Sequence, residues 1–264
     1  MNDNPIGIFD SGVGGLTVLK EIAELLPAEN ILYLGDTARV PYGIRSPETV
    51  IRYSFECTEF LLRKNIKLLV VACNTVSAIS LQKIREAVSI PVIGVIDPGA
   101  AAAVNVTKNK RIGIIGTEAT IKSSSYVKAV KALNREIEVY GLACPLFVPL
   151  VEEGWTEGTI ARLIAEKYLK DMTDKETDTI VLGCTHYPLL KGVIQEVMRD
   201  VRLVDSAIET AKAVKDALWE KRMNREAGAA SERKFYVTDS TEKFVSVGER
   251  FLQQEIKNIE KIAL

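Results

Sequence analysis

Two stretches with the same pattern decide the fold: Leu-Val-Val-Ala-Cys-Asn-Thr at residues 69–75 and Ile-Val-Leu-Gly-Cys-Thr-His at residues 180–186. Each is a short apolar run, rich in β-branched residues, that ends in a cysteine. Such a run is typical of a strand that is buried on both faces of a parallel sheet. A second pair occurs in the same order, because Ile-Gly-Ile-Phe-Asp-Ser at 6–11 resembles Ile-Gly-Ile-Ile-Gly-Thr at 112–117. Two pairs of similar segments that occur in the same order predict two related α/β halves.

The rest of the chain alternates short apolar runs with longer segments of helical periodicity. This alternation predicts an α/β protein with largely parallel sheets, whose active residues lie at the carboxyl ends of strands. The runs that we expect to form strands are Ile6–Phe9, Ile31–Leu34, Leu68–Ala72, Val92–Ile96, Ile112–Ile115, Ile137–Leu142, Thr179–Leu182, Arg202–Val204 and Phe235–Thr238. The segments that we expect to form helices include Leu16–Leu25, Glu48–Lys64, Val76–Val88, Thr159–Leu169, Leu189–Met198 and Ala207–Trp219.

Two sites are expected to mark the boundaries between the halves. They are Asp97-Pro98-Gly99 and the neighbourhood of Asp205-Ser206. The later segment Arg222–Lys234 is rich in charged residues, alanine and glycine. That composition is typical of a mobile connection or a frayed helix end.

Length and charge exclude several classes of protein. The 264 residues suffice for one large domain or two compact ones. The 34 basic and 35 acidic residues leave a net charge of −1, which argues against a large nucleic-acid footprint or a polybasic membrane contact. Residues 1–5 lack the pattern of a signal peptide, and no apolar run approaches the roughly 20 residues that span a bilayer. We therefore expect a cytoplasmic protein with no membrane or nucleic-acid partner.

The four cysteines, Cys57, Cys73, Cys144 and Cys184, are widely spaced. A disulfide framework is not expected in a cytosolic protein of this size. A structural zinc site is not expected either, because His186 is the only histidine and the close spacing of zinc ligands is missing. We expect free thiols and no metal site.

Cys73 and Cys184 each end an expected strand and precede an expected helix. Asn74 and Thr75 follow the first cysteine and Thr185 follows the second, and these are residue types that cap helix N-termini. A helix N-terminus lowers the pKa of a thiol below its ordinary value of about 8.5, and its free N–H groups can bind a carboxylate. Each turn is therefore predicted to hold both a base and an anion site.

Two such turns on facing halves suit the inversion of a carbon centre. One thiolate removes a proton from one face of an α-carbon, and the opposite thiol delivers a proton to the other face. With each sulfur about 3–3.5 Å from that carbon, the sulfurs would stand about 6–7 Å apart. A buried cysteine is often only a small apolar residue, but the matched placement of Cys73 and Cys184 weighs against that interpretation. Cys57 lies within an expected helix and is predicted to be core, and Cys144 is given no role.

Asp10 and Ser11 follow the first strand and precede the glycine-rich turn Gly12–Gly15. Asp10 could accept a hydrogen bond from a substrate ammonium group, or it could only cap the following helix. The glycine run lacks the Gly-Lys-Ser/Thr signature of a phosphate loop and is interpreted as a close-packing turn. His186, two residues after Cys184, could stabilise a thiolate or pass a proton, or could be a hydrogen-bonded structural residue.

Several segments form one wider pattern. They are Gly7–Thr17, Gly35–Thr37 with Pro41–Gly43, Ala72–Thr75, Cys144–Gly154 and Gly183–Pro188. In this order, from the N-terminus to beyond the second cysteine, they strongly resemble the glutamate racemases of the aspartate/glutamate racemase superfamily, with no departure at a motif position.

The resemblance implies two pseudo-symmetric, flavodoxin-like α/β domains with the active site in the cleft between them. The first domain would be discontinuous, with residues 1–97 plus 207–264, and the second would contain residues 98–206. The resemblance also implies a cofactor-independent isomerase, without pyridoxal phosphate, metal or nucleotide, that supplies D-glutamate for the bacterial cell wall. A homodimer is expected on the same ground.

By the same resemblance, Cys73 acts on one face of glutamate and Cys184 on the other. Asp10, Glu152 and His186 are expected to assist catalysis by orienting the substrate or tuning the thiols. Only the resemblance singles out Glu152. The residues implied to bind substrate are Asp10, Ser11, Tyr42, Gly43, Asn74, Thr75, Thr185 and His186.

Three alternatives remain open. Aspartate or another acidic amino acid could be the substrate, because sequence periodicity cannot measure pocket length. A related enzyme with one nucleophilic cysteine could perform hydrolysis or lyase chemistry through a covalent adduct. A non-catalytic two-lobed module could bind glutamate without exchanging its α-hydrogen.

Overall fold

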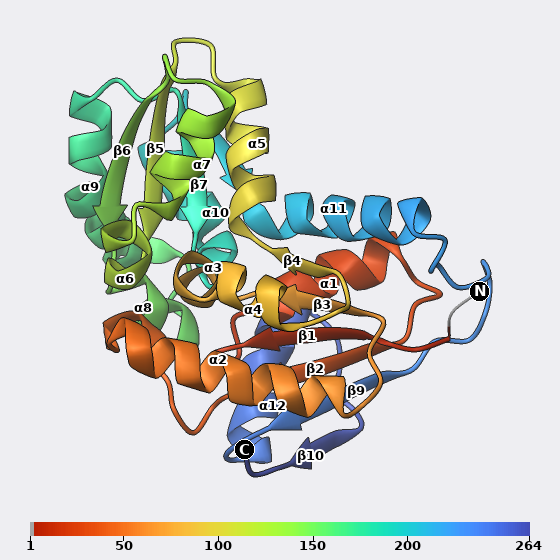
Figure 1. Cartoon of the computed structure of the whole chain (residues 1–264). Helices are drawn as coiled ribbons and strands as arrows, with labels where there is room; N and C mark the ends of the chain where they lie inside the picture. The colour runs from red at the N-terminus through yellow and green to blue at the C-terminus, as the bar shows by residue number, and fades with distance from the viewer. Residues whose placement is uncertain (1–2) are drawn as a thin grey trace.

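The computed structural model describes residues 3–264, which form two parallel sheets (Figure 1). The first sheet has the strand order β10-β9-β2-β1-β3-β4 and the second the order β6-β5-β7-β8. All strand pairings within residues 3–264 are parallel, which confirms the predicted fold class. The strands of the first sheet are β1 (Ile6–Asp10), β2 (Ile31–Gly35), β3 (Leu68–Val71), β4 (Val92–Gly94), β9 (Arg233–Val237) and β10 (Ile259–Lys261). The strands of the second are β5 (Arg111–Gly116), β6 (Glu138–Ala143), β7 (Thr179–Gly183) and β8 (Arg202–Asp205).

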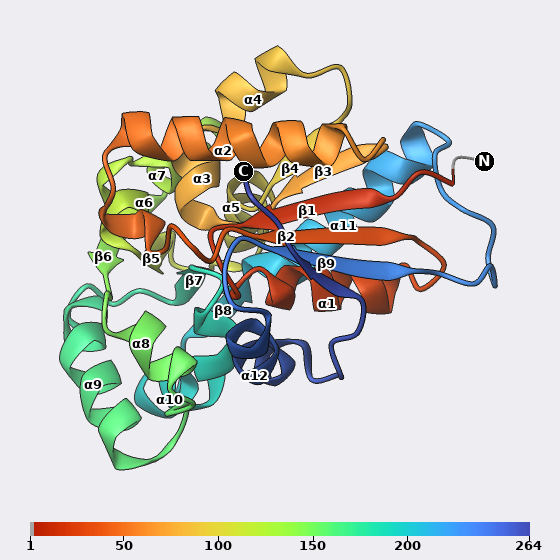
Figure 2. The same cartoon turned by 90° about the horizontal axis from the view of Figure 1, so that it is seen from below.

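Helices cover both faces of the first sheet, and we call each sheet with its helices a lobe. In Figure 2, α2 and α4 lie on one face of the six-stranded sheet, while α1 and α12 lie on the other. The α-helices are α1 (Leu16–Leu25), α2 (Pro47–Leu62), α3 (Asn74–Ile79), α4 (Leu81–Ala87), α5 (Ile96–Val106), α6 (Glu118–Lys122), α7 (Ser125–Leu133), α8 (Phe147–Glu152), α9 (Gly158–Asp174), α10 (Lys191–Val197), α11 (Ser206–Glu220) and α12 (Thr241–Leu252). Two short 3-10 helices are η1 (Tyr42–Ile44) and η2 (Tyr187–Leu190).

The repeated sequences occupy equivalent central positions in the two sheets. Strand β1 pairs with β3, with Phe9 opposite Val71, and β5 pairs with β7, with Ile115 opposite Leu182. The carboxyl ends of neighbouring parallel strands meet at one sheet edge. The segments that follow β1 and β3 therefore lie beside each other in the first lobe, as do those that follow β5 and β7 in the second.

Asp97-Pro98-Gly99, the residues expected at a boundary between the halves, lie in the first turn of α5 and not in a loop. Proline is tolerated in the first turn of a helix, where N–H groups lack intrahelical partners, and the alanines that follow favour helix. Gly99 lies where α5 meets the second lobe, since a Cβ there would stand 3.3 Å from Ser206 Cβ. The chain thus enters the second lobe through α5 and leaves it through α11, and the two helices contact each other (Figure 1).

Other differences from the predicted elements are local. The helix expected over Val76–Val88 begins at Asn74 and is divided at Ser80, whose φ of −116° departs from helical geometry. The helix expected from Leu189 starts as the 3-10 helix η2 before α10. Helices α6, α7, α8 and α12 and strand β10 were not anticipated.

The segment Arg222–Lys234 is partly anchored. The Arg225 side chain donates to Asp3 Oδ1 at 3.0 Å and to the Ala28 carbonyl at 2.6 Å. The last two residues of the segment begin β9. Within residues 3–264, no helix is long and apolar enough to cross a membrane.

Candidate active site

The carboxyl ends of the central strands of both lobes border one cavity. Every residue predicted for the site lines it except Asp10, which is fully buried. Gly12, Val40, Pro41, Thr117 and Val148 line it as well. The lining residues named by the sequence are Ser11, Tyr42, Gly43, Cys73, Asn74, Thr75, Glu152, Cys184, Thr185 and His186.

Cys73 is the residue before α3, and its side chain is almost fully buried. Its Sγ lies 3.5 Å from Ser11 Oγ. Burial raises the pKa of Cys73 to about 12, and the nearby charge of Asp10 acts in the same direction, while Ser11 and the Val76 N–H act against them. The predicted lowering of this thiol's pKa is therefore wrong, because α3 is short and burial outweighs its free N–H groups. Asn74 also does not cap this helix, since it is the first helical residue.

Cys184 is followed by the 3-10 helix η2 and not by an α-helix, so the expected helix N-terminus at this thiol is absent. Its charged partner is instead a side chain. His186 Nδ1 lies 3.9 Å from Cys184 Sγ, and His186 Nε2 lies 3.0 Å from Glu152 Oε1. The imidazole of His186 thus links a thiol and a carboxylate, one on each of its ring nitrogens.

The imidazole of His186 is held in its cationic form. Burial lowers the pKa of His186, but hydrogen bonds to Cys184 and Glu152 outweigh burial and raise it to about 10. The hydrogen bond from His186 in turn lowers the pKa of Glu152, although burial opposes this. At neutral pH the pair is therefore imidazolium and carboxylate, and the imidazolium lies beside the Cys184 sulfur.

Asp10 lies beneath the cavity. Its Oδ2 accepts the Gly12 N–H at 3.0 Å, and Gly15, not Asp10, occupies the N-cap position of α1. Burial raises the pKa of Asp10, while the charge of His186 and the hydrogen bond from Gly12 lower it. Asp10 Oδ1 is buried without a hydrogen-bond partner among residues 3–264.

The glycine-rich turn packs against the second lobe. A Cβ on Gly14 would lie 2.3 Å from Thr185 Oγ1 and 2.5 Å from His186 Nδ1. Thr17 Oγ1 donates to the Thr185 carbonyl at 3.1 Å. The interpretation of the glycine-rich turn as a close-packing turn is therefore confirmed. The turn holds Thr185 and His186 against the first lobe.

Polar side chains also cross between the lobes on the Cys73 side. Thr75 Oγ1 lies 3.0 Å from Thr117 Oγ1, and Tyr126 donates to Asn74 Oδ1 at 2.7 Å. The Asn74 Nδ2 donor is buried and has no hydrogen-bond partner among the described residues. A buried donor without a partner is costly unless a ligand or water accepts from it.

Thr117 was missed as a site residue, although a signal for it exists. In the repeat of 6–11 at 112–117, Thr117 occupies the position of Ser11. Tyr42 meets the cavity in an unexpected way, because its hydroxyl donates to the buried Asp36 carboxylate and is turned away from a ligand. Its polar contribution to the cavity is thus its backbone.

The remaining cysteines lie outside this arrangement. Cys57 is fully buried inside α2, as predicted, and Cys144 is fully buried between β6 and α8. All four cysteines are free thiols. Within residues 3–264, no group of three histidine, cysteine or acidic side chains could hold a metal ion.

Comparison with known proteins places this architecture in a family. Residues 6–214 match the family described as Asp/Glu/Hydantoin racemase. The glutamate racemase of Geobacter metallireducens is 54% identical over 260 residues, which cover 98% of this chain and 96% of that protein. The glutamate racemase of Aquifex aeolicus is 51% identical over 252 residues, which cover 96% and 95%.

Solved structures agree over the whole chain. The glutamate racemase of Francisella tularensis, solved in complex with D-glutamate, superposes with a TM-score of 0.94 at 40% identity, covering 100% of this chain and 98% of that one. A glutamate racemase of Bacillus anthracis superposes with a TM-score of 0.96 at 42% identity, covering 100% and 99%. The chain therefore belongs to the Asp/Glu/hydantoin racemase family. The relatives it resembles over its full length are glutamate racemases.

Proposed function

We infer that this chain interconverts L-glutamate and D-glutamate by moving a proton between opposite faces of the α-carbon. The observation that carries this inference is that Cys73 and Cys184, each following an equivalent strand of its own lobe, line one cavity. The names of the full-length relatives and the D-glutamate complex of the Francisella tularensis protein support glutamate as the substrate.

The polar side chains around the cavity suit an amino acid with two carboxylates. The unpartnered Asn74 Nδ2 donates to a substrate carboxylate, as do the hydroxyls of Ser11, Thr75 and Thr185. Tyr42 and Gly43 contribute backbone groups. The free Oδ1 of Asp10 and its negative charge favour the ammonium group on the Cys73 side.

In each turnover one cysteine is a thiolate and the other a thiol. The thiolate takes the α-proton, the electron pair of the broken C–H bond stays on the carbon, and the opposite thiol delivers its proton to the other face. The two sulfurs have then exchanged protonation states, so the reverse reaction uses the same groups in opposite roles. No net oxidation, reduction or co-reactant is involved. A thiol whose pKa is raised by burial, as that of Cys73 is, costs more to ionise but is a stronger base once ionised.

Three further features are part of the proposal. We divide the chain into a domain of residues 1–97 plus 207–264 and a domain of residues 98–206, supported by the composition of the two sheets. The enzyme acts as a homodimer, which light scattering tests directly. Its product, D-glutamate, serves the peptidoglycan of the cell wall.

The deciding experiment is incubation of the metal-free and cofactor-free protein, under reducing conditions, with L-glutamate in D₂O. Optical rotation should fall to zero while deuterium enters the α-position, as followed by NMR. The same reaction with aspartate measures specificity. Binding of glutamate without α-deuteration would contradict racemisation and favour a binding module, and a covalent adduct on one cysteine would favour hydrolase or lyase chemistry.

A further inference from the structure

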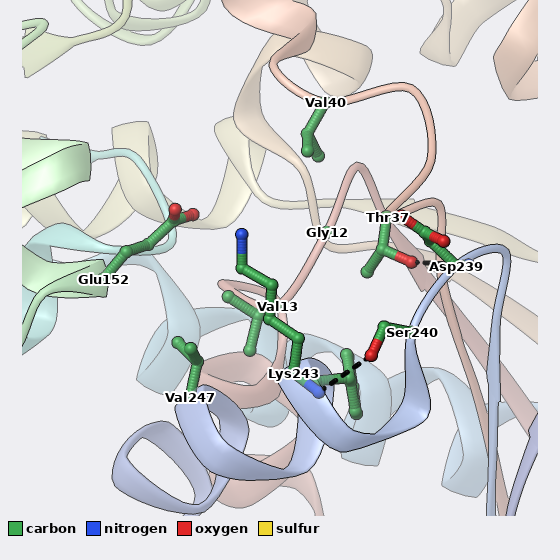
Figure 3. A pocket seen from close by; sticks show the side chains of 10 residues that line it. Gly12, Val13, Thr37, Val40, Glu152, Asp239, Ser240, Lys243 and Val247 are labelled. Atoms are coloured by element: carbon green, nitrogen blue, oxygen red, sulfur yellow. Dashed lines mark hydrogen bonds between the residues drawn. The ribbon is translucent and has the colours of Figure 1, made fainter.

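Helix α12, near the end of the chain, reaches from the first lobe to the side of the active site that carries Cys184. It packs on α1, where a Cβ at Gly248 would lie 2.8 Å from Leu16 Cδ1. A second small cavity, which shares Gly12, Val40 and Glu152 with the active site, separates the first turns of α12 from α8. Figure 3 shows Lys243 of α12 on one side of this cavity and Glu152 on the other.

The last turn of α12 closes this gap through Arg250. Its Nη2 donates to the backbone carbonyl of Glu152 at 2.6 Å. Glu152 is the last residue of α8, where carbonyls have no intrahelical partner, and the guanidinium of an arginine is well suited to donate a hydrogen bond to such a carbonyl. Gly154 leaves room for the guanidinium, because a Cβ there would lie 2.2 Å from Arg250 Nη1.

The next residue of α12 contacts the other half of the His186–Glu152 pair. Phe251 is buried, and its ring meets the His186 ring edge to face, with centroids 5.2 Å apart and an interplanar angle of 85°. Two consecutive residues of one helix, anchored in the first lobe, thus contact both members of a pair that belongs to the second lobe. On the other side of the cavity, the Cys73 sulfur faces Ser11 of its own lobe.

We propose that Arg250 and Phe251 are positioning residues that hold the Glu152–His186 pair in register with Cys184. Arg250 holds the end of α8, and through it the Glu152 carboxylate, within hydrogen-bonding distance of the imidazole. Phe251 fixes the plane of the ring so that Nδ1 faces the sulfur. The inference rests on the proposed racemisation, because it assigns these residues to one of its two thiols.

The charges around His186 make the proposal measurable through pH. The titratable groups that face His186 are Cys184, Glu152 and Asp10, and Lys243 of α12 faces Glu152. Loosening Glu152 therefore lowers the pKa of His186 from about 10 toward its ordinary value. The imidazolium is then lost at a lower pH.

The test compares Arg250→Ala, Arg250→Lys and a control, Arg162→Ala, which removes an exposed arginine of the second lobe. For Arg250→Ala we expect kcat to fall about tenfold with KM within about twofold, and the alkaline limb of the kcat profile to move to lower pH. Arg250→Lys should recover most of kcat, and Arg162→Ala should match the wild type. Wild-type kcat and an unmoved limb in Arg250→Ala would overturn the proposal.

A second readout does not depend on racemisation. Cys73 and Cys184 are both 6% exposed, so each is an internal reference for the other when iodoacetamide labelling is followed by peptide mass spectrometry. Arg250→Ala, and independently Gly154→Ala, should slow labelling of Cys184 at least about threefold and leave Cys73 unchanged, because only Cys184 loses its imidazolium. Equal change at both cysteines, or none, would overturn the proposal. An inactive wild type would instead contradict the proposed function.

Discussion

The turns that carry Cys73 and Cys184 have the same origin in sequence but different surroundings. Both follow the second strand of a central pair, line the same cavity and are equally buried. Cys73 faces a neutral hydroxyl at Ser11 and lies near the carboxylate of Asp10. Cys184 instead faces the cationic His186, which a carboxylate holds in place.

The difference teaches that two thiols on equivalent backbone segments need not have equivalent acid–base properties. Strand pairing sets where each sulfur stands, whereas neighbours from distant segments set the charge around it. Burial and Asp10 raise the pKa of Cys73 to about 12. On the opposite side an imidazolium with a pKa of about 10 faces the sulfur. The two faces of the substrate thus meet chemically different thiols.

The strongest test of the comparison removes each sulfur in turn. Cys73→Ser and Cys184→Ser should each lower racemisation at least about a thousandfold, because a serine hydroxyl is a far weaker acid and neither remaining group reaches both faces of the α-carbon. Polarimetry with L- and D-glutamate measures this loss. Full racemisation in either variant would refute the two-base arrangement.

Cys57→Ser and Cys144→Ser provide the matched controls. Both cysteines are fully buried free thiols that do not line the active-site cavity. Each replacement should leave kcat within about twofold, since any cost falls on stability and not on proton transfer. A large loss of kcat at wild-type stability would place chemistry outside the Cys73–Cys184 pair.

Much of this arrangement was predictable because buried parallel strands have a clear sequence pattern. The central strands were predicted to within a residue or two, and their carboxyl ends correctly pointed to the cavity. Helix α5 was not predictable in the same way, since the proline and glycine of Asp97-Pro98-Gly99 are typical of a boundary between domains, whereas here they lie in a helix that packs Gly99 against Ser206. Helix α12 has a signal in the spacing of Phe244 and Phe251, but this signal is weak beside the charge-rich segment that precedes the helix.

The electrostatics of the site could not be predicted from local sequence. The proposed effect of a helix N-terminus failed at Cys73 because burial and the approach of Asp10 depend on tertiary packing. His186 and Glu152 are far apart along the chain and meet only because α8 folds beside η2. Roles for these residues remain predictions, which the following variants examine.

Loss of the negative charge of Glu152, the partner of His186, should have the next largest effect on kcat. Glu152→Gln keeps a hydrogen-bonding group beside His186 but removes the negative charge, so the pKa of His186 falls from about 10. We expect kcat to fall about thirtyfold at neutral pH and its alkaline limb to move to lower pH. Measured pH profiles of both proteins test this, and an unmoved limb would show that the carboxylate does not hold the imidazolium.

The same variant makes a prediction about stability. Because the pKa of His186 is higher in the folded protein than its ordinary 6.5, its contribution is fully present below about pH 6.5 and is lost as pH rises through about 10. The free energy of unfolding should therefore differ most between wild type and Glu152→Gln near pH 6. Urea denaturation at pH 6 and pH 10 measures this, and a difference that grows with pH would contradict it.

Asp10→Asn examines the charge on the opposite side. Removing the carboxylate lowers the pKa of Cys73, so iodoacetamide should label Cys73 about tenfold faster at pH 8. Cys184 should change no more than about twofold, because His186 and Glu152 stay in place. Peptide mass spectrometry separates the two rates. Equal acceleration at both cysteines would indicate a loosened site and not a local charge effect.

The smallest effect is expected at the neutral partner of Cys73. Ser11→Ala removes a 3.5 Å contact to the sulfur and one hydroxyl of the cavity, but it leaves no charge unpaired. Hydrogen bonds between neutral groups contribute about half as much as those with an ionised partner. We therefore expect kcat to fall only about threefold, with the alkaline limb unmoved, when pH profiles of Ser11→Ala and Glu152→Gln are measured side by side. If Ser11→Ala matched Glu152→Gln in both respects, the two thiols would depend equally on their partners, and the asymmetry between the lobes would have no catalytic consequence.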